Sequence, residues 1–151
     1  MKLREYALVA EILSAIAVVV SLIFVGYQVN QNTNEIRASN RQQITTMAMS
    51  ATLSVSTSPE LAEAIAKIQK GDALSLAEET QYGYFVRGLL LDIQNAYLLY
   101  LEGRLDSQYW DTRSAILLAY LGQPLALSIY QRDKSIGSLD SRFVEWLDNQ
   151  I

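Results

Sequence analysis

The sequence contains no cysteine and no histidine among its 151 residues. Without cysteine the chain has no disulfide bond, no thiolate nucleophile and no structural zinc site of the usual type. Without histidine it lacks the commonest general base near neutral pH and the commonest metal ligand. Because most hydrolase, metalloenzyme and redox mechanisms lose their usual residues, we expect a protein that is not an enzyme and uses no cofactor or metal.

Clusters of basic residues are missing as well. The chain has 12 Lys and Arg against 16 Asp and Glu, which gives a formal net charge of -4. Nucleic-acid binding usually requires a concentrated basic face, so we expect no nucleic-acid partner. Phosphate-cradling glycine loops and serine-nucleophile motifs are also absent from the sequence, which again argues against catalysis.

The N-terminal part has one long hydrophobic run. No charged residue occurs from Ile12 to Tyr27, and the run extends to Ala7 if Glu11 is accepted near its end. A helix needs about 20 apolar residues to cross the ~30 Å hydrocarbon core of a bilayer. We therefore predict a tail and single transmembrane helix over residues 1–28, with the crossing at about 7–28.

Two alternatives compete with a membrane span. Lys2 and Arg4 precede the run, as in a cleaved secretory signal, but Glu11 lies inside it and no clear small-x-small cleavage site follows. A buried core helix is the second alternative, although that assignment suits runs of about 10 to 14 residues better. The length and composition favour the span.

Small residues recur along one face of this segment. Ala10, Ser14, Ala17 and Ser21 are spaced by four, three and four positions, which places them on one helix face. Such a stripe lets helix backbones approach closely in lipid. Glu11 lies beside the stripe, where an acid is better placed against protein than lipid. We predict helix packing and self-association there, while noting that Ala and Ser are common in membrane helices.

Beyond the hydrophobic run the sequence remains helical in pattern. Residues 30–43 contain no Gly or Pro, and sparse apolar residues recur at helical spacing. These are Val29, Ile36, Ile44, Met47 and Leu53. We predict one helix that continues to about Val55, with residues 29–57 as its extramembrane part, since helix backbone bonds are satisfied in lipid and water alike.

Residues 58–151 carry a series of helix start and stop signals. Ser58-Pro59-Glu60 begins a helix that stops at Gly71. A capping box from Ser75 to Glu78 opens a long helix that ends at Gly103.

The remaining signals complete the predicted bundle. Asp106 caps a third helix closed by Gly122, a short helix follows over Leu125 to Gln131, and a last one runs from about Leu139 to Asp148. No strand alternation is evident. We predict an all-α fold, in which a transmembrane helix continues into a long helix and a small bundle of four or five helices follows.

Aromatic and basic residues gather around the end of the long bundle helix. The aromatic side chains fit a buried core face, with each hydroxyl finding one partner. Alternatively, they line a groove in which arginines bind an anionic ligand or peptide. The candidate groove residues are Arg87, Tyr97, Tyr100, Arg104, Tyr109 and Trp110.

Two stretches resemble a known group of proteins. These are "AIAVVVSLIFVGYQVNQNTNEIRAS" and "NAYLLYLEGRLDSQYW". They are similar to a widespread group of small, functionally uncharacterised bacterial single-span membrane proteins, with an N-terminal hydrophobic segment, a Gln/Arg-Asn-Thr stretch and a helical domain. The resemblance implies a bacterial inner-membrane location and a cytoplasmic C-terminal domain, and it implies no known reaction. Counting Lys2 and Arg4 before the segment against Arg37 and Arg41 after it gives no clear orientation.

These observations lead to one functional expectation and one alternative. We expect a non-enzymatic membrane-anchored protein that contacts lipid and acts as an oligomeric scaffold or as an accessory subunit with other membrane-protein subunits. The alternative is a membrane-tethered sensor whose helical domain binds a small anionic ligand or peptide.

Overall fold

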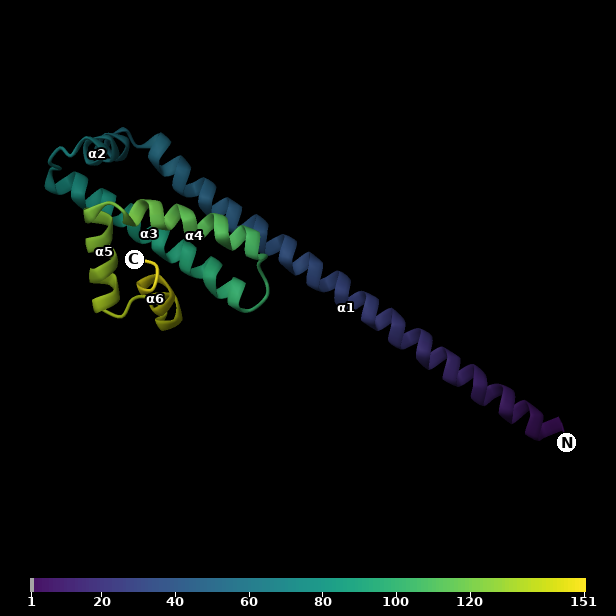
Figure 1. The fold of residues 1–151 in the computed structure, drawn as a ribbon. Helices are drawn as coiled ribbons and strands as arrows, with labels where there is room; N and C mark the ends of the chain where they lie inside the picture. The colour runs from purple at the N-terminus through teal and green to yellow at the C-terminus, as the bar shows by residue number, and fades with distance from the viewer. Residues whose placement is uncertain (1) are drawn as a thin grey trace. The chain divides into compact units, whose positions relative to one another are not determined.

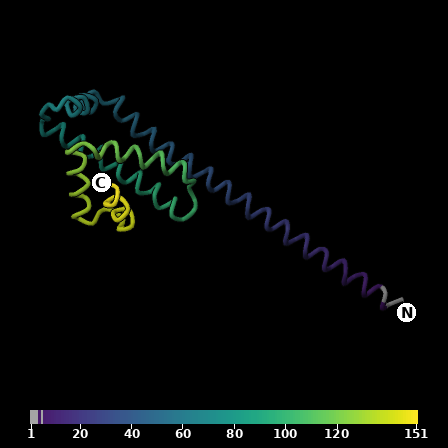
Figure 2. Tube along the Cα trace, in the orientation of Figure 1, coloured from purple at the N-terminus to yellow at the C-terminus, as the bar shows by residue number. Residues whose placement is uncertain are grey.

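The computed structural model describes residues 2–151, apart from the side chains of residues 2, 3 and 5 (Figure 2). Lys2, which enters the count of basic residues above, therefore has a side chain outside the description. The described residues form six α-helices and no β-strand, which confirms the all-α prediction (Figure 1). The helices are α1 (Lys2–Thr57), α2 (Pro59–Lys70), α3 (Leu76–Leu101), α4 (Ser107–Leu121), α5 (Pro124–Ser135) and α6 (Ser141–Asp148).

The chain divides into two units, one up to Ala38 and one from Ser39 to Ile151. The second unit therefore begins before Ser58, where the sequence pattern placed the start of the bundle domain. The physical reason lies in α1 itself, because Ile44 is fully buried in the hydrophobic core of this unit and Asn40 is buried at its edge. Asn40 Nδ2 also donates a 3.1 Å hydrogen bond to the backbone oxygen of Arg104.

Helix α3 is the centre of the compact unit. It lies against α2, α4, α5 and α6 (Figure 1). It also supplies the largest share of the buried apolar side chains. These side chains recur at helical spacing along its length, which explains why an apolar-rich segment of this length folds as a helix and not as strands. They are Tyr82, Val86, Leu89, Leu90, Ile93, Ala96 and Tyr97.

Local capping signals fix most helix boundaries. The Ser58 hydroxyl accepts a hydrogen bond from the Leu61 amide at the start of α2, and Pro59 occupies the first helical position. Gly71 ends α2 in the left-handed region, at a φ of 79°, where a side chain would be strained. Gly103 has a φ of 67° just after α3 and confirms the predicted stop there.

At three boundaries the structure differs in detail from the sequence-based prediction. Asp106 occupies the N-cap of α4, but its side chain makes no capping hydrogen bond and instead accepts from Arg41 Nη1 at 3.0 Å. Helix α5 continues past the predicted end at Gln131 to Ser135, and the buried Asp133 is ion-paired in this last turn. Helix α6 starts after Asp140, whose carboxylate accepts from the Arg142 amide, so the predicted start at Leu139 was slightly early.

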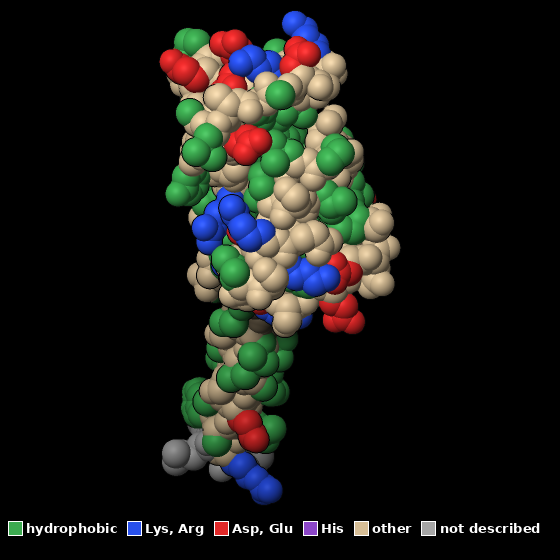
Figure 3. Space-filling view, turned by 90° about the vertical axis from the view of Figure 1, so that its left-hand side faces the viewer, with side chains coloured by type: hydrophobic (Ala, Val, Ile, Leu, Met, Phe, Trp, Pro, Cys, Tyr) green, Lys and Arg blue, Asp and Glu red, His purple; other side chains and the backbone are tan. Residues whose placement is uncertain are grey.

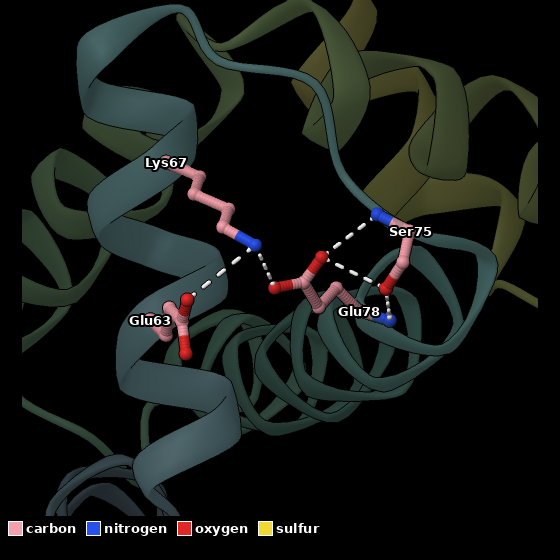
Figure 4. Close-up of polar contacts among 4 residues, drawn as sticks. All are labelled: Glu63, Lys67, Ser75 and Glu78. Atoms are coloured by element: carbon pink, nitrogen blue, oxygen red, sulfur yellow. Dashed lines mark hydrogen bonds and ion pairs between the residues drawn. The ribbon is translucent and has the colours of Figure 1, made fainter.

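A polar cluster joins α2 to the start of α3 (Figure 4). Glu78 Oε2 accepts from the backbone amide of Ser75 at 2.7 Å and from its hydroxyl at 2.8 Å, which completes the predicted capping box. Glu78 Oε1 accepts from Lys67 Nζ at 2.5 Å, and Glu63 lies 3.5 Å from the same nitrogen. The hydrogen bonds from Lys67 and then from Ser75 lower the pKa of Glu78 to about 2.

This cluster predicts an acid-sensitive contribution to folding. The pKa of Glu78 is lower in the folded chain than its usual 4.5, so its contribution is present above about pH 4.5 and is lost as the pH falls towards 2. We expect Glu78→Gln to lower the stability at pH 7 and to flatten its decline between those pH values. Urea unfolding in detergent, followed by the fluorescence of Trp110 and Trp146, measures this, because both tryptophans lie in the compact unit.

The matched control is Glu79→Gln, which removes an exposed carboxylate from the same first turn of α3. This control should keep the acid-dependent slope of the unaltered chain. Equal slopes for the Glu78→Gln and Glu79→Gln chains would contradict the assignment.

Candidate functional site

The N-terminal part of α1 exposes its hydrophobic side chains. An 18-residue window of this helix has a mean hydropathy of 2.7, and none of it is buried. In the face shown in Figure 3, hydrophobic side chains lie along this part of the helix, and charged groups occur only near its end. The helix is long and apolar enough to cross a membrane, a property that signal sequences and some buried helices share.

The small-residue stripe lies on this exposed segment. The Ser14 hydroxyl donates to the backbone oxygen of Ala10 at 2.8 Å, and the Ser21 hydroxyl donates to that of Ala17 at 2.8 Å. Each hydroxyl is thus satisfied within the helix, so the stripe needs no polar partner. Ala17 and Ser21 also line a shallow depression of about 270 Å³, and the side chain of Glu11 is exposed.

The aromatic residues of the predicted groove lie in the core. Tyr97 and Trp110 are buried, and their ring centroids are 5.1 Å apart. Tyr100 stacks on Trp110 at 5.8 Å, and Trp146 of α6 meets Trp110 edge to face at 4.7 Å. Aromatic pairs at these separations stabilise a core, so the structure assembles these rings as packing and not as the wall of a groove.

The other predicted groove residues are dispersed. The Tyr109 hydroxyl is hydrogen-bonded to the Thr45 hydroxyl of α1, and Arg104 Nη1 donates to Glu102 at 3.1 Å. Arg87 lies about 21 Å before the end of α3, by the rise of 1.5 Å per residue, and it pairs with Asp133. The structure therefore does not bring Arg87 and Arg104 to one site.

A buried ion pair between α3 and α4 escaped the sequence analysis. Arg113 Nη2 donates to Asp92 Oδ2, and the two side chains are only 8% and 11% exposed. Asp92 Oδ1 and Arg113 Nε have no hydrogen-bond partner within the described residues. Burial raises the pKa of Asp92, and the attraction of Arg113 only partly opposes this shift. The available signal was that Arg113 shares a helix face with Trp110 and Leu117, both apolar and buried.

Two grooves flank this ion pair. Asp92 lines a groove of about 800 Å³, Arg113 lines one of about 560 Å³, and Ala51, Phe85 and Leu89 line both. Most of the residues that line them are apolar or carry small hydroxyls. Among the side chains that the structure describes, no three acidic groups lie close enough to hold a metal ion.

Comparison with known proteins adds no relative. No family model matches the chain, and no curated protein or solved structure is significantly similar to it.

Removing one member of the buried ion pair should destabilise the chain much more than removing both members. Arg113→Met leaves the Asp92 carboxylate buried without a counter-charge, which should cost about 3 kcal/mol or more of unfolding free energy. The double change Asp92→Leu with Arg113→Met removes both charges and should recover most of that loss. Chemical unfolding of the full chain in detergent, followed by tryptophan fluorescence, measures both variants.

Arg142→Met is the control, because Arg142 pairs with Asp140 at the surface and its side chain is 58% exposed. Its effect should be much smaller than that of Arg113→Met. A double variant as unstable as Arg113→Met alone would contradict the prediction.

Proposed function

We propose that the protein is a single-span, non-enzymatic protein of a bacterial inner membrane. In this proposal α1 anchors the compact unit and the protein serves as an oligomeric scaffold or accessory subunit of a membrane complex. The observation that carries the proposal is the exposed apolar segment of α1, none of which is buried. The absence of histidine and cysteine from the sequence supports the non-enzymatic part.

The cost of leaving this segment in water supports a membrane location. Burying one large aliphatic side chain contributes about 1.5 to 3 kcal/mol. The large apolar side chains from Leu8 to Val25 are all more than half exposed, so their transfer out of water is worth on the order of 20 kcal/mol. A helix over residues 7–28 is about 33 Å long, which matches the ~30 Å hydrocarbon core.

Helix packing within the membrane would supply the contacts of the scaffold. Side chains on the stripe of Ala10, Ser14, Ala17 and Ser21 are short, and the two serine hydroxyls are already bonded to the helix backbone. A second helix can therefore approach closely without leaving a polar group unpaired in lipid. Glu11, at the edge of this face, would lie against the partner helix or the headgroups.

The proposed orientation rests on the resemblance and not on the flanking charges. Basic residues flank the apolar segment on both sides, with Arg4 before it and Arg37 and Arg41 after it. The resemblance to bacterial single-span proteins favours a cytoplasmic compact unit.

The anchor predicts retention of the uncleaved chain in washed membranes. Membranes from cells that produce the full chain should keep the protein through alkaline and urea washes, at the 16.9 kDa of the whole sequence. Val19→Arg with Ile23→Arg should release it, because each charge costs about 2.5 to 3.5 kcal/mol at mid-membrane. A shortened chain would indicate a cleaved signal, and release of the unaltered protein by the washes would exclude the span.

The stripe predicts a change in association state. Ser14→Leu with Ala17→Leu adds bulk where two helices would touch, so the dissociation constant of the oligomer should rise by about tenfold or more. Light scattering of the full chain in mild detergent measures the mass. Ile12→Leu with Val19→Leu, on the opposite face, should leave the mass unchanged, and an unaltered mass in both variants would exclude packing through the stripe.

A further inference from the structure

Helices α3 and α5 enclose a groove of about 430 Å³ that is separate from the Asp92–Arg113 pair. Arg87 of α3 and Arg132 of α5 both line it. Apolar side chains line it as well, including Leu76, Leu125 and Ile129. The groove therefore combines two guanidinium groups with apolar side chains, and Glu79, Thr80 and Ser128 also line it.

A buried carboxylate holds the two arginines. Asp133 is completely buried, with Arg87 Nε at 3.2 Å from its Oδ2 and Arg132 Nε at 3.5 Å from its Oδ1. Neither oxygen of Asp133 makes a hydrogen bond within the described part of the chain. A buried charge of this kind is costly unless it is paired, so the two guanidinium groups are drawn to it from two helices.

The guanidinium groups of Arg87 and Arg132 keep N–H donors that a ligand could use. Each guanidinium has five N–H donors, and in both arginines it is the Nε edge that meets Asp133. Neither guanidinium group donates a hydrogen bond among the residues that the structure describes, and the shortest contact of each with Asp133 is made by Nε. The side chains remain accessible, since that of Arg87 is 38% exposed and that of Arg132 is 60% exposed. An anion in the groove can therefore accept hydrogen bonds from both guanidinium groups.

The local charge selects the kind of anion. At this end of the groove, Arg87 and Arg132 carry two positive charges and Asp133 one negative charge, which leaves a net charge of +1. Glu79 also lines the groove, about 12 Å earlier along α3 by helical rise, and its charge disfavours a second negative group. A monoanion balances the site, and a planar carboxylate matches the fork of a guanidinium group.

The groove has the two arginines at one end and, at the other, Leu76 beside Glu79 and Thr80. A Cβ on Gly83 would lie 3.9 Å from Ile129, and one helical turn further along both helices Arg87 meets Asp133. Leu76 precedes Gly83 on α3 and Leu125 precedes Ile129 on α5, so both line the groove further from the arginines along their own helices. Leu76 is 81% exposed, so an apolar group seated there would remove it from water.

We propose that this groove binds a small organic monocarboxylate, with its carboxylate on Arg87 and Arg132 and its apolar body towards Leu76 and Leu125. This site is independent of the membrane anchor, because all its residues belong to the compact unit.

Calorimetric titration of the full chain in non-ionic detergent with hexanoate tests the proposal, with empty micelles subtracted. We expect saturable binding at one site, and no binding of hexanamide, which keeps the shape and lacks the charge. Arg132→Gln should weaken hexanoate binding by about tenfold or more, because it removes one charge-assisted partner. Asp133 keeps Arg87 in this variant, so its unfolding by urea should remain cooperative.

Arg104→Gln is the matched control, because it removes the same charge at the far end of α3 and should leave hexanoate binding unchanged. Inorganic phosphate is the competing probe and should displace hexanoate only weakly. The proposal is overturned if hexanoate does not bind saturably, if hexanamide or phosphate binds better, or if the Arg132→Gln chain binds hexanoate as the unaltered chain does.

Discussion

Because α3 packs against α2, α4, α5 and α6 at once, its buried apolar side chains determine where the other bundle helices lie. Tyr97 near its C-terminal end contacts rings of α4 and α6, and Gly83 near its start lies beside Ile129 of α5. Charged residues on such a helix cannot all reach water. Asp92 and Arg87 therefore find their partners on neighbouring helices, Arg113 on α4 and Asp133 on α5.

Two of the ion pairs of α3, Asp92–Arg113 and Arg87–Asp133, differ in how far their side chains are buried. Asp92 and Arg113 are both almost fully buried, so their attraction mainly offsets the cost of removing both from water. In the other pair only Asp133 is fully buried, while Arg87 remains accessible along with Arg132. A buried carboxylate that holds two accessible guanidinium groups in place can help to form a binding site. An ion pair in which both side chains are buried contributes to helix packing instead.

The parts of the fold that follow local rules could be predicted from the sequence. Ser58, Ser75 and Gly71 act within one helical turn, so their residue types suffice to place the ends of α2 and the start of α3. The carboxylate of Asp106 could not be assigned, because its partner Arg41 is 65 residues away in the chain. The separation of Arg87 from the aromatic residues could not be predicted either, because its partner Asp133 lies on α5, far along the chain.

The short side chains of α1 have different consequences in the two units of the chain. Ser and Thr hydroxyls bond to the preceding helical turn in both, as Ser14 and Thr46 show. In the apolar segment, short residues of this kind would let a second helix approach closely in lipid. Between residues 47 and 57, short side chains such as Ala51 cannot fill the space beside α3, so grooves remain on both sides of α1. Ile44 is the large side chain of α1 that is fully buried in the core, and it fixes α1 to the bundle while leaving those grooves open.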